Sequence, residues 1–488
     1  MKFFYVGLCT SLVALTSCGG GSEGTTSSAR PVISTNDISV KENVVEPLDI
    51  RFGNSTTIAI AGADADSFQI NGLNLRFKKA PDYELPLDRD ANNTYEISVT
   101  ASNKEHSVTE TIEVDVQDEE EFHTGPYHPL SADEFDYRLH LRNADEEMTI
   151  EYLLTTEEKL WGLAVVDAGH VAYSSKQGRL TVMDLDSLEE FPFNISDHFS
   201  IETCGQGGVF GIEKIDLADA IRIFFSASEV GPNATSRLSL FSVDLDLKAT
   251  PSFSNVQRVF SEQSVASCSH YGGAILVVED SLYLSGGDRG RRDDIQREDI
   301  NFGNSYRFKI EDDGSLKPHP TNTFSSNPYV FTRGHRNVQG MTLVPLTGDI
   351  VASEHGPQGG DELNILKSGT NYGWPLATYG EEYGGGKIGE TSVDGYEDPL
   401  VYYLPSIAPR ELIYVNSENN IGSLRNTIVL TSLKFGFVSV VSFDSSRPSF
   451  TYMELPGNRI SGLSMSKDGD IYFVTNDSPS TLGRLTKK

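Results

Sequence analysis

Basic residues are scarce in this sequence. Of its 488 residues, 39 are Lys or Arg and 70 are Asp or Glu, which gives a formal charge of −31 at pH 7. A surface of this sign repels phosphate backbones, so the composition argues against nucleic acid as a partner. The acidic residues are spread along the chain, as is typical of a solvated surface, and carboxylates also suit Ca²⁺.

The N-terminal apolar run is short. Residues 3–15 follow Met1 and Lys2. Their number suits the core of a signal peptide and not a bilayer span, which takes about 20 apolar residues. The run ends in Leu-Thr-Ser-Cys at 15–18, and Gly-Gly-Gly-Ser follows. This pattern resembles a bacterial lipobox, whose Cys becomes the lipidated N-terminus. The alternative is an ordinary secretory signal with a chance Cys.

The lipobox resemblance implies an exported protein. We expect residues 1–17 to be a signal peptide, Cys18 to carry the lipid and residues 18–30 to form a flexible linker. The lipid would then be the protein's only attachment to a membrane, at the periplasmic face or at the cell surface. Gly19 resembles the pattern of sorting to the outer membrane more than retention at the inner membrane.

Cysteine is scarce as well, with four residues in the chain. Cys9 would leave with the signal peptide and Cys18 would take the lipid, so only Cys204 and Cys268 remain. In an oxidising compartment these two can pair as a disulfide. The alternative is two buried free thiols.

The composition favours an all-β protein. Val, Ile, Thr, Tyr and Phe recur in short runs, and 44 glycines supply turns. No long apolar stripe of helical period competes with this pattern. Residues 31–118 alternate in short strands over a length that suits a β-sandwich. The acidic, Pro-containing stretch at 119–135 indicates a second linker.

Several phrases in residues 31–118 resemble a cadherin-type repeat. They include Val-Lys-Glu-Asn at 40–43, Pro-Asp-Tyr-Glu at 81–84 and the ending Val-Asp-Val-Gln-Asp at 114–118. Cadherin-like repeats bind Ca²⁺ at such acidic positions. The resemblance implies that the ligands here would be Glu42, Asp82, Glu84 and Asp118. The alternative is a spacer domain with an acidic surface.

Residues 136–488 repeat one unit, an apolar strand, a turn with Asp or Gly, and a second apolar strand. Examples are 161–173, 275–284, 341–352 and 460–474. This rhythm is typical of β-propeller blades, and about six blades of four strands would fill the length. The sequence therefore predicts a six-bladed β-propeller behind a cadherin-like β-sandwich. Propellers place functional loops at one end of a central channel.

Polar residues concentrate in three phrases, at 333–340, 353–364 and 369–375. Together they resemble the soluble PQQ-dependent glucose/sorbosone (aldose sugar) dehydrogenases in order and spacing. Further similar phrases are Gly-Gln-Gly-Gly at 205–208, His-Tyr-Gly-Gly at 270–273, Gly-Asp-Arg-Gly at 287–290 and Ser-Leu-Lys at 432–434. The resemblance covers roughly residues 160–485.

The resemblance implies a PQQ- and Ca²⁺-dependent enzyme that oxidises an aldose at C1 to the lactone. His270 would be the general base while hydride passes to the quinone, and Arg336 would stabilise the cofactor oxygen that becomes negative. PQQ is a planar trianion, so its carboxylates need cations. The implied cofactor ligands are Gln206, Asn337, Lys434 and Arg459. Backbone carbonyls of Gly356 and Pro357 would hold Ca²⁺. A small redox carrier would be the electron acceptor.

Each of these residues also has a structural interpretation. His270 is otherwise a turn residue, Arg336 an ion-pair residue and Lys434 an edge charge, and Gly356-Pro357 is otherwise only a turn. Asp361 and Glu362 either add a carboxylate to a Ca²⁺ site or fix their loop. We expect His335 and His355 to be structural.

The chain departs from the resembled pattern after Arg459, where Ser461 and Gly462 stand in place of Arg and Asp. This removes one cation from the expected carboxylate cluster. Cys204 and Cys268 each precede an implied site residue by two positions. If Gln206 and His270 face one cofactor, the two thiols lie close together, which supports a disulfide at the channel mouth.

Two other functions compete with sugar oxidation. The propeller could bind glycans or proteins without catalysis, an idea that the cadherin-like module favours. It could also be a metal-assisted hydrolase such as a lactonase, which would need a carboxylate-rich metal cage that the sequence does not reveal.

Overall fold

The computed structural model describes residues 29–35, 38–41, 45, 47–78, 81, 88–89, 92–117, 141–143, 148–416, 419, 421, 424–442, 449–455, 457 and 459–487. The chain divides into two compact units, Met1–Glu120 and Glu121–Lys488. The predicted signal peptide with Cys18, the predicted Ca²⁺ ligands Glu42, Asp82, Glu84 and Asp118, and the predicted linker at 119–135 lie outside the described residues. Among the described residues, no helix is long and apolar enough to cross a membrane.

The N-terminal unit is built from three sheets around one core. The largest has the order β2 (Ile38–Lys41), β8 (Ser107–Gln117), β7 (Thr94–Ser102) and β4 (Thr57–Ala61). The two small sheets pair β1 (Val32–Thr35) with β3 (Ile50–Gly53), and β5 (Phe68–Asn71) with β6 (Asn74–Phe77). Strand β7 alternates buried and exposed residues, and Tyr95 packs edge-on against Phe77 with ring centroids 4.9 Å apart. The resemblance to a cadherin-type repeat stays a prediction.

The C-terminal unit contains six sheets. The first sheet has the order β11 (Leu160–Val165), β12 (His170–Ser175), β13 (Arg179–Asp184) and β14 (Glu190–Asn194). The second has the order β15 (Val209–Asp216), β16 (Ile221–Val230), β17 (Ser236–Asp246) and β18 (Ser252–Ser261). The third has the order β19 (Gly272–Val278), β20 (Ser281–Gly286), β21 (Asn304–Ile310) and β22 (Leu316–Pro318), and β23 (Val330–Arg333) also pairs with β21.

The other three complete the unit. The fourth sheet has the order β24 (Val338–Val344), β25 (Asp349–Glu354), β26 (Asp361–Ile365) and β27 (Val401–Tyr403). The fifth has the order β28 (Pro409–Val415), β29 (Thr427–Ser432), β30 (Phe437–Ser442), β31 (Ser449–Glu454) and β9 (Leu141–Asn143). The sixth has the order β32 (Ile460–Met465), β33 (Ile471–Thr475), β34 (Ser480–Lys487) and β10 (Met148–Thr156). The helical elements of the described residues are 3₁₀ turns, η1 (Ala65–Ser67), η3 (Ile195–Asp197) and η4 (Arg292–Asp294).

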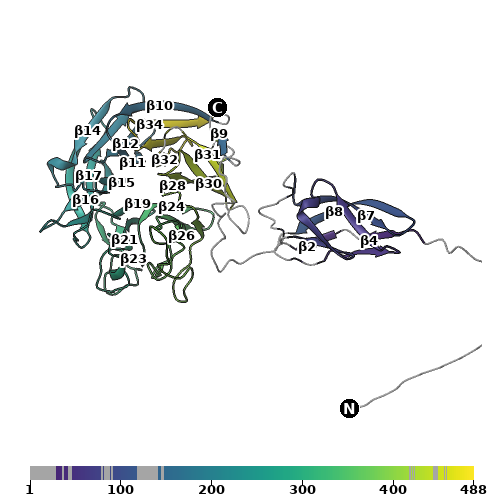
Figure 1. The fold of residues 1–488 in the computed structure, drawn as a ribbon. Helices are drawn as coiled ribbons and strands as arrows, with labels where there is room; N and C mark the ends of the chain where they lie inside the picture. The colour runs from purple at the N-terminus through teal and green to yellow at the C-terminus, as the bar shows by residue number, and fades with distance from the viewer. Residues whose placement is uncertain are drawn as a thin grey trace, which may run out of the picture. The chain divides into compact units, whose positions relative to one another are not determined.

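The six sheets form a closed ring. Their first strands contact one another in the order β11, β15, β19, β24, β28 and β32, and β32 contacts β11 (Figure 1). The ring closes because β10, from the start of the unit, pairs antiparallel with the C-terminal strand β34. The preceding strand β9 pairs in parallel with β31 of the neighbouring blade. The predicted all-β fold with a six-bladed propeller is confirmed.

Neighbouring blades are joined by buried hydroxyl groups. Ser285 of β20 donates to the Val338 carbonyl of the next blade at 2.9 Å, and Ser353 of β25 donates to the Arg410 carbonyl at 2.7 Å. Each first strand also shifts register against its second strand near its beginning. The shift admits the backbone of the next blade, so a Cβ on Gly211 would lie 2.5 Å from the Gly273 carbonyl oxygen.

These contacts predict that Ser285→Ala destabilises the propeller. The variant loses a donor to Val338 and an acceptor for the Ala274 amide, which lies 2.9 Å from the Ser285 hydroxyl inside the protein. One unsatisfied buried group costs about 1–3 kcal/mol, so the free energy of unfolding should fall by about 2 kcal/mol. Denaturant unfolding measures it. The matched control Ser254→Ala, at an exposed position of β18, should change it by less than about 0.5 kcal/mol. Equal losses in both variants would contradict the prediction.

Candidate active site

Most of the predicted site residues line two cavities of the propeller. The first, of about 370 Å³, is lined by Gln206, Asn337 and Arg459 together with Trp161, Lys159 and Lys176. The second, of about 540 Å³, is lined by His270, Arg336 and Pro357 together with Asp288, Trp374 and Tyr383. Hydrogen bonds join the two groups, and in one of them the His270 amide donates to the Gln206 side-chain oxygen at 2.7 Å.

His270 is held by a buried carboxylate. Its Nδ1 lies 2.7 Å from Oδ1 of Asp288, whose side chain is 2 % exposed. A neutral imidazole that donates from Nδ1 keeps the lone pair of Nε2, so the ring is oriented as a base. The His270 backbone has φ 46°, which is unusual for a non-Gly residue and typical of positions that the surrounding structure imposes.

Asp288 connects three loops. Its Oδ1 also accepts the Gly290 amide at 2.6 Å, and its Oδ2 accepts the indole N–H of Trp374 at 2.8 Å. Its own amide donates to the Arg336 carbonyl at 2.7 Å. The carboxylate therefore fixes the turn after β20, the His270 loop before β19 and the loop between β26 and β27 relative to one another.

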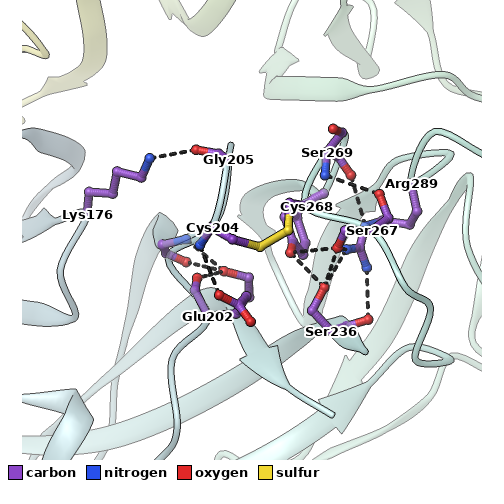
Figure 2. The surroundings of a disulfide bond; sticks show 12 residues. Lys176, Glu202, Cys204, Gly205, Ser236, Ser267, Cys268, Ser269 and Arg289 are labelled. Atoms are coloured by element: carbon purple, nitrogen blue, oxygen red, sulfur yellow. Dashed lines mark hydrogen bonds between the residues drawn. A yellow bond between two sulfur atoms is a disulfide. The ribbon is translucent and has the colours of Figure 1, made fainter. Parts of the chain in front are cut away.

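A disulfide joins the loops that carry Gln206 and His270 (Figure 2). Cys204 and Cys268 have Cα atoms 5.5 Å apart. The Gln206 amide donates to the Cys268 carbonyl at 2.8 Å. Gly205 has φ 52°, and a Cβ there would lie 2.6 Å from that same carbonyl oxygen, so only glycine fits between the loops.

A buried arginine supports the same loop from the opposite side. The Arg289 guanidinium donates to the carbonyls of Ser269 at 3.0 Å and Ser267 at 2.9 Å (Figure 2). It also lies 3.6 Å from the centre of the Tyr271 ring. The fully buried Arg289 side chain therefore holds the backbone before His270 and the ring of Tyr271 after it.

Glu354 organises the loop that carries Arg336 and Asn337. Its carboxylate accepts the amides of Arg336 and, at 3.2 Å, Asn337, and it also lies 2.9 Å from Nδ1 of His335. The Arg336 guanidinium donates to the His355 carbonyl at 2.9 Å and lies 5.5 Å from the Trp374 ring. The Arg336 side chain is therefore held beside the second cavity without a carboxylate partner among the described residues.

Asn337 and His355 contact both sides of the first cavity. The Asn337 side-chain oxygen accepts the Gly272 amide at 3.1 Å, and in the part of the chain that the structure describes its amide nitrogen has no acceptor. His355 places Nε2 2.6 Å from the Pro409 carbonyl, while burial lowers its pKa. His355 and the fully buried His335 thus connect neighbouring loops by hydrogen bonds.

The segment with Gly356 and Pro357 is fixed by Asp361. Asp361 accepts the Gly356 amide at 2.9 Å, the Ala408 amide at 2.7 Å and the Ser406 hydroxyl at 2.5 Å, so its oxygens are occupied within the loop. Among the described residues, no hydrogen bond reaches the carbonyl oxygens of Gly356 and Pro357. Those two oxygens remain available to a cation.

Glu362 takes a different position from Asp361. It lines a small cavity with Gly356 and Glu354. Burial, and next the neighbouring Glu354 carboxylate, raises the pKa of Glu362 to about 8. Both effects favour the protonated form of Glu362.

Lys434 is less well placed than expected. The described residues that line the two cavities do not include it. Its side chain is exposed, and Nζ donates to the Ser406 carbonyl at 2.9 Å. Arg459 does line the first cavity, and it donates to the Leu433 carbonyl at 2.8 Å.

Positions 461 and 462 serve the contact between blades. The Ser461 hydroxyl is fully buried and donates to the Leu160 carbonyl at 3.1 Å. A Cβ on Gly462 would lie 2.8 Å from the Trp161 carbonyl oxygen. Longer charged side chains at these positions would disrupt the packing of the last blade against the first, which gives a physical reason for the departure from the resembled pattern.

The sequence motifs missed several residues of the site. Asp288 and Trp374 stand inside recognisable phrases but have no role assigned by residue type alone, and the same holds for Glu354. Lys159 and Lys176 belong to no motif. Their only signal is position, directly before β11 and directly after β12, at the strand ends that approach the Gln206 loop.

The chain resembles known sugar dehydrogenases. Residues 157–484 match the model of the family described as "Glucose / Sorbosone dehydrogenase". The chain is 30 % identical over 302 residues to the aldose sugar dehydrogenase YliI of Escherichia coli K12. The alignment covers 58 % of this chain and 78 % of that protein. It is 24 % identical over 297 residues to the quinoprotein glucose dehydrogenase B of Acinetobacter calcoaceticus, with 46 % and 61 % covered.

Solved structures give the same comparison. The apo form of the soluble aldose sugar dehydrogenase of Escherichia coli matches with a TM-score of 0.63 and 26 % identity, over 70 % of this chain and 100 % of that chain. The PQQ-bound form of an aldose sugar dehydrogenase from Streptomyces coelicolor matches with a TM-score of 0.55 and 22 % identity, over 70 % and 98 %. This second likeness establishes the fold alone.

Proposed function

The chain belongs to the glucose/sorbosone dehydrogenase family, and from this premise we propose that it oxidises an aldose sugar at C1 to the lactone with PQQ as cofactor. The observation that carries the proposal is the His270–Asp288 pair at the wall of the larger cavity. A base oriented by a buried carboxylate at the wall of a cavity suits removal of a proton from a hydroxyl group.

The first cavity fits the chemistry of PQQ. It combines three cationic side chains, Lys159, Lys176 and Arg459, with the amide groups of Gln206 and Asn337. Cations pair with carboxylates, and amides pair with the polar edge of a quinone ring system. When bound, PQQ would supply an ortho-quinone that accepts a hydride. The matching family and the quinoprotein relative support this assignment.

The residues of the chain would handle the proton and the charge. His270 accepts the proton of the sugar C1 hydroxyl at Nε2, because Nδ1 is engaged by Asp288. Asp288 stabilises the imidazolium that forms and keeps the ring in place. Arg336 lines the same cavity and would stabilise the cofactor oxygen that becomes negative as the sugar is oxidised.

We propose a Ca²⁺ ion bound by the carbonyl oxygens of Gly356 and Pro357. No cluster of three or more His, Cys, Asp or Glu that could hold a metal occurs in the described part of the chain, so the proposal rests on backbone oxygens. Ca²⁺ accepts carbonyl and water ligands. Asp361 holds the Gly356 amide and so orients this segment. Bound there, the ion would act as a Lewis acid.

His270→Ala should remove the base. In the full chain supplied with PQQ and Ca²⁺, sugar-dependent dye reduction should slow at least about 100-fold, while PQQ binding is largely retained. Asp288→Asn should lower kcat with little change in KM, because the base is then poorly oriented. The matched control is His198→Ala, at an exposed histidine that stacks on Phe193. It should leave kcat and KM unchanged.

Two results would overturn these assignments. If the unmodified chain reduces no dye with any common aldose, the proposed oxidation is wrong and a binding function without catalysis becomes the better hypothesis. If His270→Ala keeps the full kcat, the enzyme uses another base.

Removal of Ca²⁺ should abolish turnover. A chelator should stop dye reduction, and added Ca²⁺ should restore it. Asp361→Asn should raise the Ca²⁺ concentration needed for half-maximal activity, because the Gly356 segment loses its fixed orientation. Asp312→Asn, at an exposed turn, should not change that concentration. Full activity after exhaustive chelation, with no metal detected by elemental analysis, would refute the site.

We also propose that the chain is exported and anchored by a lipid on Cys18. The lipobox-like segment at 15–18 and its polar tether support this. In a Gram-negative host, the full-length chain should incorporate labelled fatty acid and sediment with membranes. Cys18→Ser should lose the label and become soluble. A Cys18→Ser variant that still carries the label and sediments would contradict the anchor.

A further inference from the structure

The first cavity gathers three cations at the junction of two blades. Lys159 stands directly before β11, Lys176 directly after β12, and Arg459 directly before β32. Because β11 and β32 are neighbouring first strands, the first and last blades bring these side chains together. The family motifs pointed only to Arg459.

Lys176 is built into the wall of this cavity. Its Nζ donates to the Gly205 carbonyl at 2.7 Å (Figure 2), and its amide donates to the Lys159 carbonyl at 2.9 Å. A Cβ on Gly208 would lie 2.7 Å from Cγ of Lys176, so the aliphatic stem packs against the loop that carries Gln206. The ammonium group is thereby held at a defined place beside a residue of the proposed cofactor site.

The cavity has positive charge without a protein counterion. No Asp or Glu is among the described residues that line it. Burial, and next the Lys159 ammonium, lowers the pKa of Lys176. Three cationic side chains around one cavity, in a chain with a formal charge of −31, form a site that an anion would stabilise.

The two lysines lie near position 461, where the resembled pattern has a cation that this chain lacks. Ser461 stands where the resembled pattern has a second arginine, and its hydroxyl contacts the carbonyl of Leu160, the residue that follows Lys159. We propose that Lys159 and Lys176 bind the carboxylates of PQQ and supply the positive charge absent at position 461. The inference rests on the proposed function, since it names the residues that hold its cofactor.

The test measures PQQ binding itself, by equilibrium dialysis of the purified full chain at neutral pH. Lys176→Gln and Lys159→Gln should each raise the Kd for PQQ roughly 10- to 100-fold, as expected when a charge-assisted hydrogen bond is lost. Lys176→Arg should keep the Kd near that of the unmodified chain. Lys248→Gln is the matched control, because Lys248 also donates to a backbone carbonyl, that of Asp219 at 3.2 Å, outside the cavity.

A salt titration separates charge from packing. The Kd of the unmodified chain should rise with salt more steeply than that of Lys176→Gln, because one screened charge pair is gone. Thermal unfolding checks that each variant is folded. Lys159 is exposed, so Lys159→Gln reports on charge even if Lys176→Gln weakens the fold.

The outcomes distinguish the two proposals. An unmodified chain that binds no PQQ refutes the proposed function. A chain that binds PQQ, with Lys159→Gln and Lys176→Gln binding equally well, refutes this inference alone. A loss in Lys176→Gln that Lys176→Arg does not restore, with Lys159→Gln unaffected, also refutes it, because Lys176 would then only support the Gln206 loop.

Discussion

The hydrogen bond between His270 and the buried carboxylate of Asp288 is the contact on which the arrangement of the site depends. A carboxylate that is almost completely buried needs donors, and three different loops provide them here. Oδ1 is held by His270 and the Gly290 amide, and Oδ2 by the indole of Trp374. His270, the indole of Trp374 and the backbone of Arg336 are therefore held in one geometry around Asp288.

The propeller explains why these groups meet at all. Residues of the site stand in the short segments that lead into the first strands of their blades: Lys159 before β11, Gln206 before β15, His270 before β19, Arg336 and Asn337 before β24, and Arg459 before β32. Because the first strands surround one axis, their beginnings converge although the residues are spread over three hundred positions. The early register shift in each first strand, supported by hydroxyls such as Ser285, lets the blades approach closely enough for these loops to share hydrogen bonds.

Much of this could be predicted from the sequence, and the limit has a physical cause. The hairpin rhythm predicts blades because strand periodicity is local, and the resemblance of whole phrases to a known family singles out Gln206, His270 and Asn337, which line the two cavities. The Ser-Leu-Lys phrase does not reveal that the Lys434 ammonium donates to the Ser406 carbonyl, because such a phrase fixes the backbone and not the direction of a long flexible side chain. Lys159 and Lys176 were missed because their role comes from the meeting of the first blade with the last, and local pattern carries no information on that contact.

The strongly acidic composition of the chain makes local positive charge, such as that of Lys159 and Lys176, important for binding an anion. A chain with a formal charge of −31 repels a trianionic cofactor at long range, whereas a sugar is neutral and feels no such field. Retention of the cofactor must therefore depend on charge concentrated at short range, where screening by salt is weakest. A cavity lined by three cations and, within the described residues, by no carboxylate meets that requirement. The arginine absent at position 461 is then no defect of the site. Packing between the last and first blades takes up that position, and the same junction brings two lysines to the cavity from the neighbouring blade.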